Sequence, residues 1–362
     1  MSANTSANTS GAVELVPVLA NHRFDEAALG RYLNGKLAGF EGAFTVRQFQ
    51  GGQSNPTFHI QAGDHAYVLR KKPPGKLLPS AHAVDREYAV IRALQGSAVP
   101  VPKVHLLCTD ESVIGQMFYV MDHVPGRVFN DRLLPGCAPA ERMAMNHDLI
   151  KVLAALHAVD PRAVGLGEFG RAEGYVGRQV ARWSKQYEAS KVDEVPSMDK
   201  LAAWLPANDP KQDQTVIIHG DYRPGNVIFA PNAPKVAAVL DWELSTLGHP
   251  FPDLAYYCLP YRIPRGGISQ GLLGMDLAAH GFPSEPDIVA AYCRARGIAE
   301  IPHWDYYIVF SLFRLSAIMA GVYRRGLDGN ASDARALERG VAFKKLADLA
   351  WEIASKVKPL AG

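Results

Sequence analysis

The sequence has 362 residues, which at about 100 to 200 residues per domain predicts two domains or one large domain with a two-lobed core. Its composition is ordinary, with 48% hydrophobic, 20% charged and 9% aromatic residues, and this excludes collagen-like, disulfide-framed and predominantly disordered chains. The 38 Lys and Arg residues nearly balance the 36 Asp and Glu residues, so the net charge of +2 gives no reason to expect a nucleic acid or an anionic membrane as a partner.

Residues 1–12 contain a repeat of Ala-Asn-Thr-Ser and lack both the basic start and the apolar core of a signal peptide. We therefore expect a disordered tail. Four cysteines are widely spaced without a CxxC pair, which predicts reduced, buried thiols in a cytoplasmic protein. They are Cys108, Cys137, Cys258 and Cys293.

Residues 13–121 are predicted to form a small lobe that opens with a helix over Asp25–Leu37. Three strands are expected next, at Phe44–Gln50, Thr57–Gln61 and Tyr67–Arg70. The turn-forming run Gly51–Pro56 joins the first two strands and predicts a glycine-bearing hairpin. A helix over Asp85–Leu94 and a β-prone run over Val113–Met121 follow.

Residues 122–362 have mainly helical periodicity, interrupted by a β-rich, hairpin-like island at Val216–Trp242. Helices are expected at Glu141–Val159, Tyr175–Ser190, Ser284–Arg296, Trp304–Arg325 and Ser332–Lys358. Ser284 and Asp287 form a capping-box variant, and Gly297 stands in the C-cap position of the same helix. The apolar run Ile308–Val322 is too short to span a membrane and contains Arg314, so we expect a buried helix there. The predicted fold class is α+β, with a small N-terminal antiparallel-sheet lobe and a larger, mainly helical C-terminal lobe.

Three polar residues, Asp221, Asn226 and Asp241, stand at the ends of apolar strand-like runs. A carboxylate in a loop can accept a proton from a hydroxyl, and an amide oxygen with a second carboxylate suits Mg²⁺. Phosphoryl transfer needs this combination. Any one of these residues could be only a turn or cap residue, but the composite HGDxxPxN, followed by a hairpin that ends in Leu-Asp, favours a functional site.

On these residues the sequence resembles the aminoglycoside phosphotransferase and choline kinase group of small-molecule kinases, and above all the kinase-like domains associated with acyl-CoA dehydrogenases. The resemblance covers nearly the whole chain from about Val13 and implies a protein-kinase-like two-lobed fold. It implies that Asp221 is the catalytic base or the aspartate that orients the acceptor, supported by His219 and Asp253. It also implies that Asn226 and Asp241 are Mg²⁺ ligands.

The same resemblance places Glu243 where some relatives carry a carboxylate, as a metal ligand or a residue that positions the acceptor; a surface glutamate is the alternative. The family's nucleotide loop corresponds to Gly51, Gly52, Ser54 and Asn55, where short or absent side chains let backbone N–H groups approach phosphates. No GxxxxGK[ST] motif is present, which excludes the P-loop class.

Arg70 stands where kinases keep a phosphate-binding lysine, and strand alternation places it on the same face as Val68 and opposite Lys71. Its partner is expected to be Glu87 on the following helix; the alternative for Glu87 is a solvated glutamate near a helix N-terminus. The backbone of Asp122 and Val124 corresponds to the hinge that meets the nucleotide base.

The acceptor half, residues 254–325, has seven arginines, no lysine and five acidic residues. Unless these arginines are only solvated helix faces, the count favours a neutral or anionic acceptor, such as a hydroxyacyl compound, over a polycationic aminoglycoside. We therefore expect ATP- and Mg²⁺-dependent transfer of the γ-phosphate to a hydroxyl of a small molecule. The alternatives are a nucleotide-binding pseudokinase or regulatory module and a true aminoglycoside phosphotransferase. The oligomeric state stays open.

Overall fold

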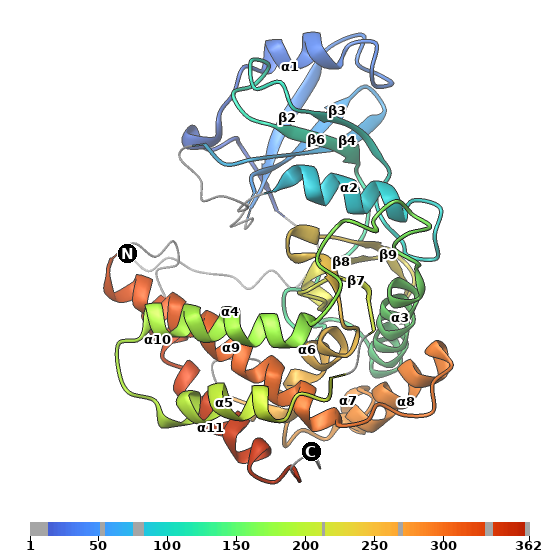
Figure 1. Cartoon of the computed structure of the whole chain (residues 1–362). Coiled ribbons are helices and arrows are strands. Elements are labelled where there is room, and N and C mark those ends of the chain that lie inside the picture. Colours follow the sequence, from blue (N-terminus) through green and yellow to red (C-terminus); the bar gives the residue numbers. More distant parts are fainter. Residues whose placement is uncertain are drawn as a thin grey trace, which may run out of the picture. The chain divides into compact units, whose positions relative to one another are not determined.

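The structure, a computed structural model, describes residues 14–50, 55–74, 83–211, 214–266, 271–329 and 336–358 (Figure 1). The predicted tail over residues 1–12 and the predicted loop residues Gly51, Gly52 and Ser54 lie outside these ranges. The chain divides into two compact units. Unit 1 consists of Met1–Cys137 and Pro224–Ser245, and unit 2 consists of Ala138–Arg223 and Thr246–Gly362. Unit 1 therefore extends past the predicted lobe boundary after residue 121 and takes in a second stretch of chain.

Unit 1 contains an antiparallel sheet of six strands in the order β1-β2-β3-β4-β6-β5. The strands are β1 Leu15–Val16, β2 Phe44–Phe49, β3 Thr57–Ala62, β4 His65–Lys71, β5 Val104–Cys108 and β6 Phe118–Asp122. Burial alternates along β3, where Phe58, Ile60 and Ala62 are buried and the residues between them are half-buried, because successive side chains of a strand point to opposite faces. The buried face packs with α1 (Glu26–Leu33) in one hydrophobic cluster.

Helix α2 (Val84–Leu94) packs against β5 and β6 and against the 3₁₀ turn η3 (Trp242–Leu244) (Figure 1). The second stretch of unit 1 adds a hairpin of β8 (Val227–Phe229) and β9 (Val236–Val239). Together these contacts bring the chain after β9 next to α2.

Unit 2 is built around the long helix α9 (Trp304–Leu327), which contacts α4, α5, α6, α10 and α11 (Figure 1). The other helices are α3 Pro139–Ala158, α4 Tyr175–Ser190, α5 Pro196–Ala207, α6 Phe251–Arg262, α7 Leu277–His280, α8 Glu285–Arg296, α10 Ala336–Gly340 and α11 Phe343–Ala354. Two short strands, β7 (Val216–Ile218) and β10 (Thr246–Gly248), pair antiparallel.

Helix α9 is the helix of the described residues that is long and apolar enough to cross a membrane, with a mean hydropathy of 1.4. Within the protein, 72% of its apolar window is buried. A core helix of a folded unit has these properties, and α9 is the central helix of unit 2.

The predicted fold class is confirmed: an antiparallel sheet in the N-terminal part and a mainly helical remainder. The predicted capping box at Ser284 and the C-cap at Gly297 are both present on α8. All four cysteines are buried, as expected, and no disulfide joins them in the part of the chain that the structure describes.

Three predicted elements were wrong in extent. The helix predicted over Asp25–Leu37 ends at Leu33. The run predicted as a strand over Val113–Met121 is a turn up to Gln116, because Asp110 accepts the Ser112 N–H at 2.9 Å and Gly115 adopts a φ of 85°. Of the helix predicted over Ser332–Lys358, residues 332–335 lie outside the described residues, and the described part is divided into α10 and α11. Gly340 ends α10 where an added Cβ would lie 2.6 Å from the backbone of Tyr323, so only glycine fits this approach to α9.

Candidate active site

The loop predicted to be catalytic, which contains His219 and Asp221 and is called the catalytic loop below, follows β7 in unit 2. The backbone N–H groups of His219 and Gly220 donate to the two carboxylate oxygens of Asp253, at 2.6 and 2.9 Å. Asp253 lies in the first turn of α6 and is almost fully buried. The supporting position predicted for Asp253 thus corresponds to a carboxylate that holds the backbone of the loop.

Burial acts to raise the pKa of Asp253, but the hydrogen bond from His157 and the loop donors hold it below its ordinary value. The His157 ring lies 3.5 Å from Asp253 through Nε2 and 2.7 Å from the Tyr292 hydroxyl through Nδ1. Burial lowers the pKa of His157, so its ring is neutral near pH 7. Asp253 is therefore a buried anion that is stabilised by donors rather than by a direct cation.

Asp221 comes directly after this clamped backbone. Its side chain is 22% exposed, so the carboxylate is open to a reactant. The Arg223 Nε lies 3.3 Å from the Asp221 carboxylate. The backbone N–H of Asp221 donates to the Nδ1 of His219. His219 is fully buried. It stabilises the conformation of the loop through this hydrogen bond.

A cavity of about 500 Å³ opens in unit 1 against the sheet face that is opposite the α1 core. Val68 and Arg70 point into it from β4, and the strand pairing sets them beside Met121 and Tyr119 of β6. The apolar and aromatic residues around it come from both stretches of unit 1. They include Phe49, Val68, Met121, Ile228 and Leu240. Such an apolar slot with a few polar groups at one end suits a flat ring that carries a charged tail.

The hinge residues predicted for base binding, Asp122 and Val124, both line the cavity. Gly126 follows them, and a Cβ there would lie 2.3 Å from the Phe229 carbonyl oxygen, so glycine permits the close approach of this segment to β8. Asn55, directly after the undescribed loop residues, is buried.

Arg70 forms the predicted ion pair with Glu87: the Arg70 Nε lies 2.8 Å from a Glu87 oxygen. Its Nη2 donates to Asp241 at 2.7 Å. Lys71 is on the other face, where its Nζ donates to Gln116. The alternation predicted for this strand is therefore confirmed.

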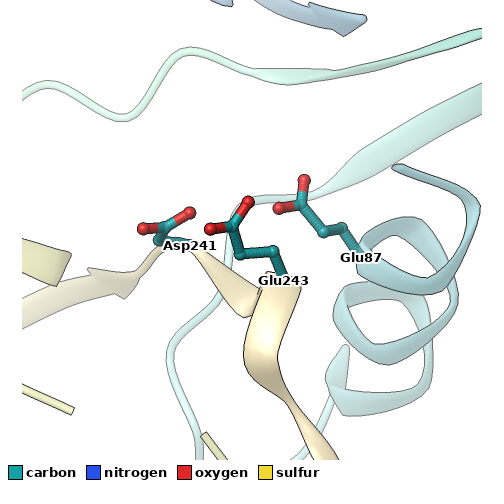
Figure 2. A group of neighbouring side chains, drawn as sticks. All are labelled: Glu87, Asp241 and Glu243. Atoms are coloured by element: carbon teal, nitrogen blue, oxygen red, sulfur yellow. The ribbon is translucent and has the colours of Figure 1, made fainter. Parts of the chain in front are cut away.

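The carboxylates of Glu87, Asp241 and Glu243 converge, each offering one oxygen within 4.8 Å of the others (Figure 2). One arrives from α2 and two from the chain after β9. Asp241 adopts a left-handed conformation with a φ of 64° and a ψ of 57°, a strained geometry that is common at functional sites. Asn226 lies beside this group in the fold, since its carbonyl accepts the Leu240 N–H at 2.8 Å and its side chain lines the same cavity.

This donor set fits a hard divalent cation. It consists of carboxylate oxygens and an amide oxygen, which Mg²⁺ prefers, and the Oε1 of Glu87 is buried without a hydrogen-bond partner. Burial raises the pKa of Glu87 to about 7. Arg70 acts to lower this pKa, and the carboxylates of Asp241 and Glu243 act to raise it further. The group thus has an excess of negative charge that Arg70 alone does not balance.

Sequence reasoning missed several residues of these sites. Tyr119 donates to Glu87 at 3.2 Å from β6. His157 of α3 contacts Asp253, the carboxylate that holds the loop backbone, and Arg314 of α9 contacts the loop itself. No local motif marks these residues, because their partners are 32 to 96 positions away in the chain.

The sequence model of the phosphotransferase enzyme family matches residues 45–306. Human acyl-CoA dehydrogenase family member 11 is 46% identical over 331 residues, which are 89% of this chain and 42% of that protein. The chain spans less than half the length of the curated relatives it matches.

Among solved structures, a candidate aminoglycoside phosphotransferase from Ralstonia eutropha is 45% identical, with a TM-score of 0.86 over 93% of this chain and all of that one. A ternary complex of aminoglycoside phosphotransferase APH(4)-Ia with AMP-PNP and hygromycin B is 15% identical, with a TM-score of 0.59 over 91% of this chain and 99% of that one. The second likeness concerns the fold alone, and it confirms the predicted kinase-like fold.

Proposed function

Since this chain belongs to the phosphotransferase enzyme family, we propose that it is an ATP- and Mg²⁺-dependent kinase that phosphorylates a hydroxyl of a small molecule. The observation that carries the proposal is one cavity in unit 1 that joins an apolar slot to Arg70, Asn226 and Asp241. A nucleobase suits the slot, and phosphates suit the arginine and the cation site at its polar end.

In the proposed reaction, Asp221 accepts the proton of the acceptor hydroxyl as that oxygen attacks the γ-phosphorus of ATP. The new O–P bond forms while the bond from the γ-phosphorus to the β–γ bridging oxygen breaks, which leaves a phosphoester and ADP. Asn226, Asp241 and Glu243 would hold Mg²⁺, which when bound neutralises charge on the phosphates. Arg70 would bind the phosphates by the same guanidinium that now contacts Glu87 and Asp241.

Charge near the catalytic loop supports a neutral or anionic acceptor, such as a hydroxyacyl compound. The arginines that contact this loop in unit 2 are Arg223, on the Asp221 carboxylate, and Arg314, on the Gly220 carbonyl. A polycationic acceptor would be repelled by both.

The number of arginines in residues 254–325 carries less weight as evidence for the acceptor class, because several of these arginines have internal partners. Arg262 pairs with Glu285 and Asp305, Arg324 with Asp328, and Arg314 with the loop.

The test is a screen of hydroxylated metabolites with γ-labelled ATP, run with the wild type and with Asp221→Asn. We expect hydroxyacyl compounds to accept phosphate faster than kanamycin-like aminoglycosides. Loss of the base should reduce turnover by about 10² to 10⁴ while nucleotide affinity is retained.

Asp328→Asn, at the exposed end of α9, is the matched control and should keep full turnover. Undiminished transfer by Asp221→Asn would reject the proposed role of that residue. Faster phosphorylation of an aminoglycoside would reject the acceptor class and leave the kinase assignment in place.

A further inference from the structure

The backbone of Gly220, directly before Asp221, is held at its N–H by a carboxylate and at its carbonyl by a guanidinium. Its N–H donates to the Asp253 carboxylate at 2.9 Å, and its carbonyl accepts from the Arg314 Nη2 at 2.6 Å. Gly220 has a φ of 86°, a left-handed conformation that other residues rarely adopt. The backbone that sets the direction of Asp221 is therefore fixed from two sides.

Arg314 lies near the middle of α9 with 7% of its surface exposed. Its guanidinium carbon is 5.7 Å from the Trp183 ring centre and 5.4 Å from that of Tyr256. Among the residues that the structure describes, no carboxylate lies within ion-pair distance of Arg314.

A buried guanidinium without an acidic partner is costly unless other groups compensate for its lost hydration. Two aromatic faces offset part of this cost. The strongest contact is the charge-assisted hydrogen bond to Gly220, whose N–H in turn is bound by a buried anion. The backbone of Gly220 thus lies between the Arg314 cation and the Asp253 anion and is bound by both.

We propose that Arg314 is a positioning residue that acts on Asp221 through Gly220. This inference rests on the proposed function, because it assumes that the direction of Asp221 matters for phosphoryl transfer. A shift of about 1 Å in a catalytic group costs about 10²-fold in rate.

The experiment compares Arg314→Gln, Arg314→Lys and a matched control, Arg262→Gln, which also removes an arginine with internal partners in unit 2. Hydrogen exchange is measured by mass spectrometry on the peptide that covers residues 216–223, and kcat and KM for ATP are measured with the best acceptor from the screen. Arg314→Gln should speed exchange at His219 and Gly220 by about tenfold, as expected for the loss of a charged hydrogen bond. It should also lower kcat by about 10²-fold without a change in KM for ATP.

Arg314→Lys keeps the charge and one donor, so its exchange rate and kcat should fall between those of the wild type and Arg314→Gln. The control should be less stable than the wild type but unchanged in both readouts at the loop. Exchange at 216–223 in Arg314→Gln no faster than in the control would show that Arg314 only packs, and would overturn the proposal. Equal kcat losses for the Lys and Gln variants would overturn it as well.

If Arg314→Gln does not fold, Arg314→Lys decides the question, and wild-type exchange at His219 and Gly220 in that variant rejects the proposal. Failure of the proposed function gives a different result. In that case Asp221→Asn retains turnover, whereas the exchange data still report whether Arg314 holds the loop.

Discussion

Arg70 uses two different nitrogens for two carboxylates, with Nε near Glu87 and Nη2 on Asp241. The planar guanidinium makes this possible, because it offers donors in several fixed directions, whereas a lysine offers one compact ammonium. The departure from the lysine pattern therefore has a structural use in this chain. Burial acts to lower the pKa of Arg70, but Glu87 and the neighbouring acidic groups raise it above its ordinary value, so the cation persists.

His249, which follows β10, allows a pH prediction at the residue scale. Its ring is 2% exposed and is stacked on Tyr307 at 5.3 Å. Burial first, and then the nearby His157, lowers its pKa to about 4. Between pH 6.5 and 4 the unfolded chain therefore binds a proton that the folded chain does not, and this histidine destabilises the folded state as the pH falls through that window.

His249→Phe should remove this contribution and keep the stacked ring. We expect the loss of unfolding free energy between pH 7 and pH 4.5 to become about 2 kcal/mol smaller than in the wild type. Urea titrations at both pH values measure it, with a substitution of the exposed His147 on α3 as the control. A pH dependence equal to that of the wild type would show that His249 is not a buried neutral ring.

The start of helix α8 is fixed by hydrogen bonds between residues that are close in the sequence. The Ser284 side chain accepts from the Asp287 N–H, and the Asp287 carboxylate accepts from the Ser284 N–H. Gly297, with a φ of 66°, closes the other end. These contacts join residues at most four positions apart, so the sequence alone contains the whole signal.

Ser284→Ala should lower the unfolding free energy by about 1 kcal/mol, because the cap bond is lost. Ser284→Thr keeps a capping hydroxyl and should stay much closer to the wild type. Chemical denaturation measures both variants. Equal stability of Ser284→Ala and the wild type would mean that α8 is held by its packing alone.

The distance along the chain between contacting residues explains which parts of the fold and the site could be predicted. The pair of Arg70 and Glu87 was predictable because the family resemblance places a partner on the following helix and strand alternation limits the face of Arg70. Strand β10 was not, since it has three residues and pairs with β7 about 30 residues earlier. Arg314 was not either, because its neighbours come from α4, α6 and the catalytic loop, and only the folded chain brings them together.

For the whole molecule, the proposed function and the regulatory alternative agree on nucleotide binding and differ on turnover. Binding to the folded state alone stabilises a protein by about 2.7 kcal/mol when the ligand is at 100 times its Kd. MgATP should therefore raise the melting temperature by a few degrees, about 2 to 4 °C at most for a chain of this length.

ATP with a chelator should give a smaller shift, and Asp241→Asn should remove the dependence on Mg²⁺. Thermal unfolding with and without each ligand measures these effects. The absence of any shift at saturating MgATP would contradict the nucleotide site. A shift without turnover on any acceptor would favour the regulatory module.

The two stretches of unit 1 have a practical consequence for anyone who wishes to isolate a nucleotide-binding fragment. A fragment that ends at Cys137 would contain the sheet, Arg70 and Glu87, but it would lack Ile228 and Leu240 from the wall of the cavity and Asp241 from its charged end. Such a fragment would expose apolar strand surface and leave Arg70 with one carboxylate instead of two. Because Pro224–Ser245 lies within the span that encodes unit 2, no single cut in the chain separates the two units.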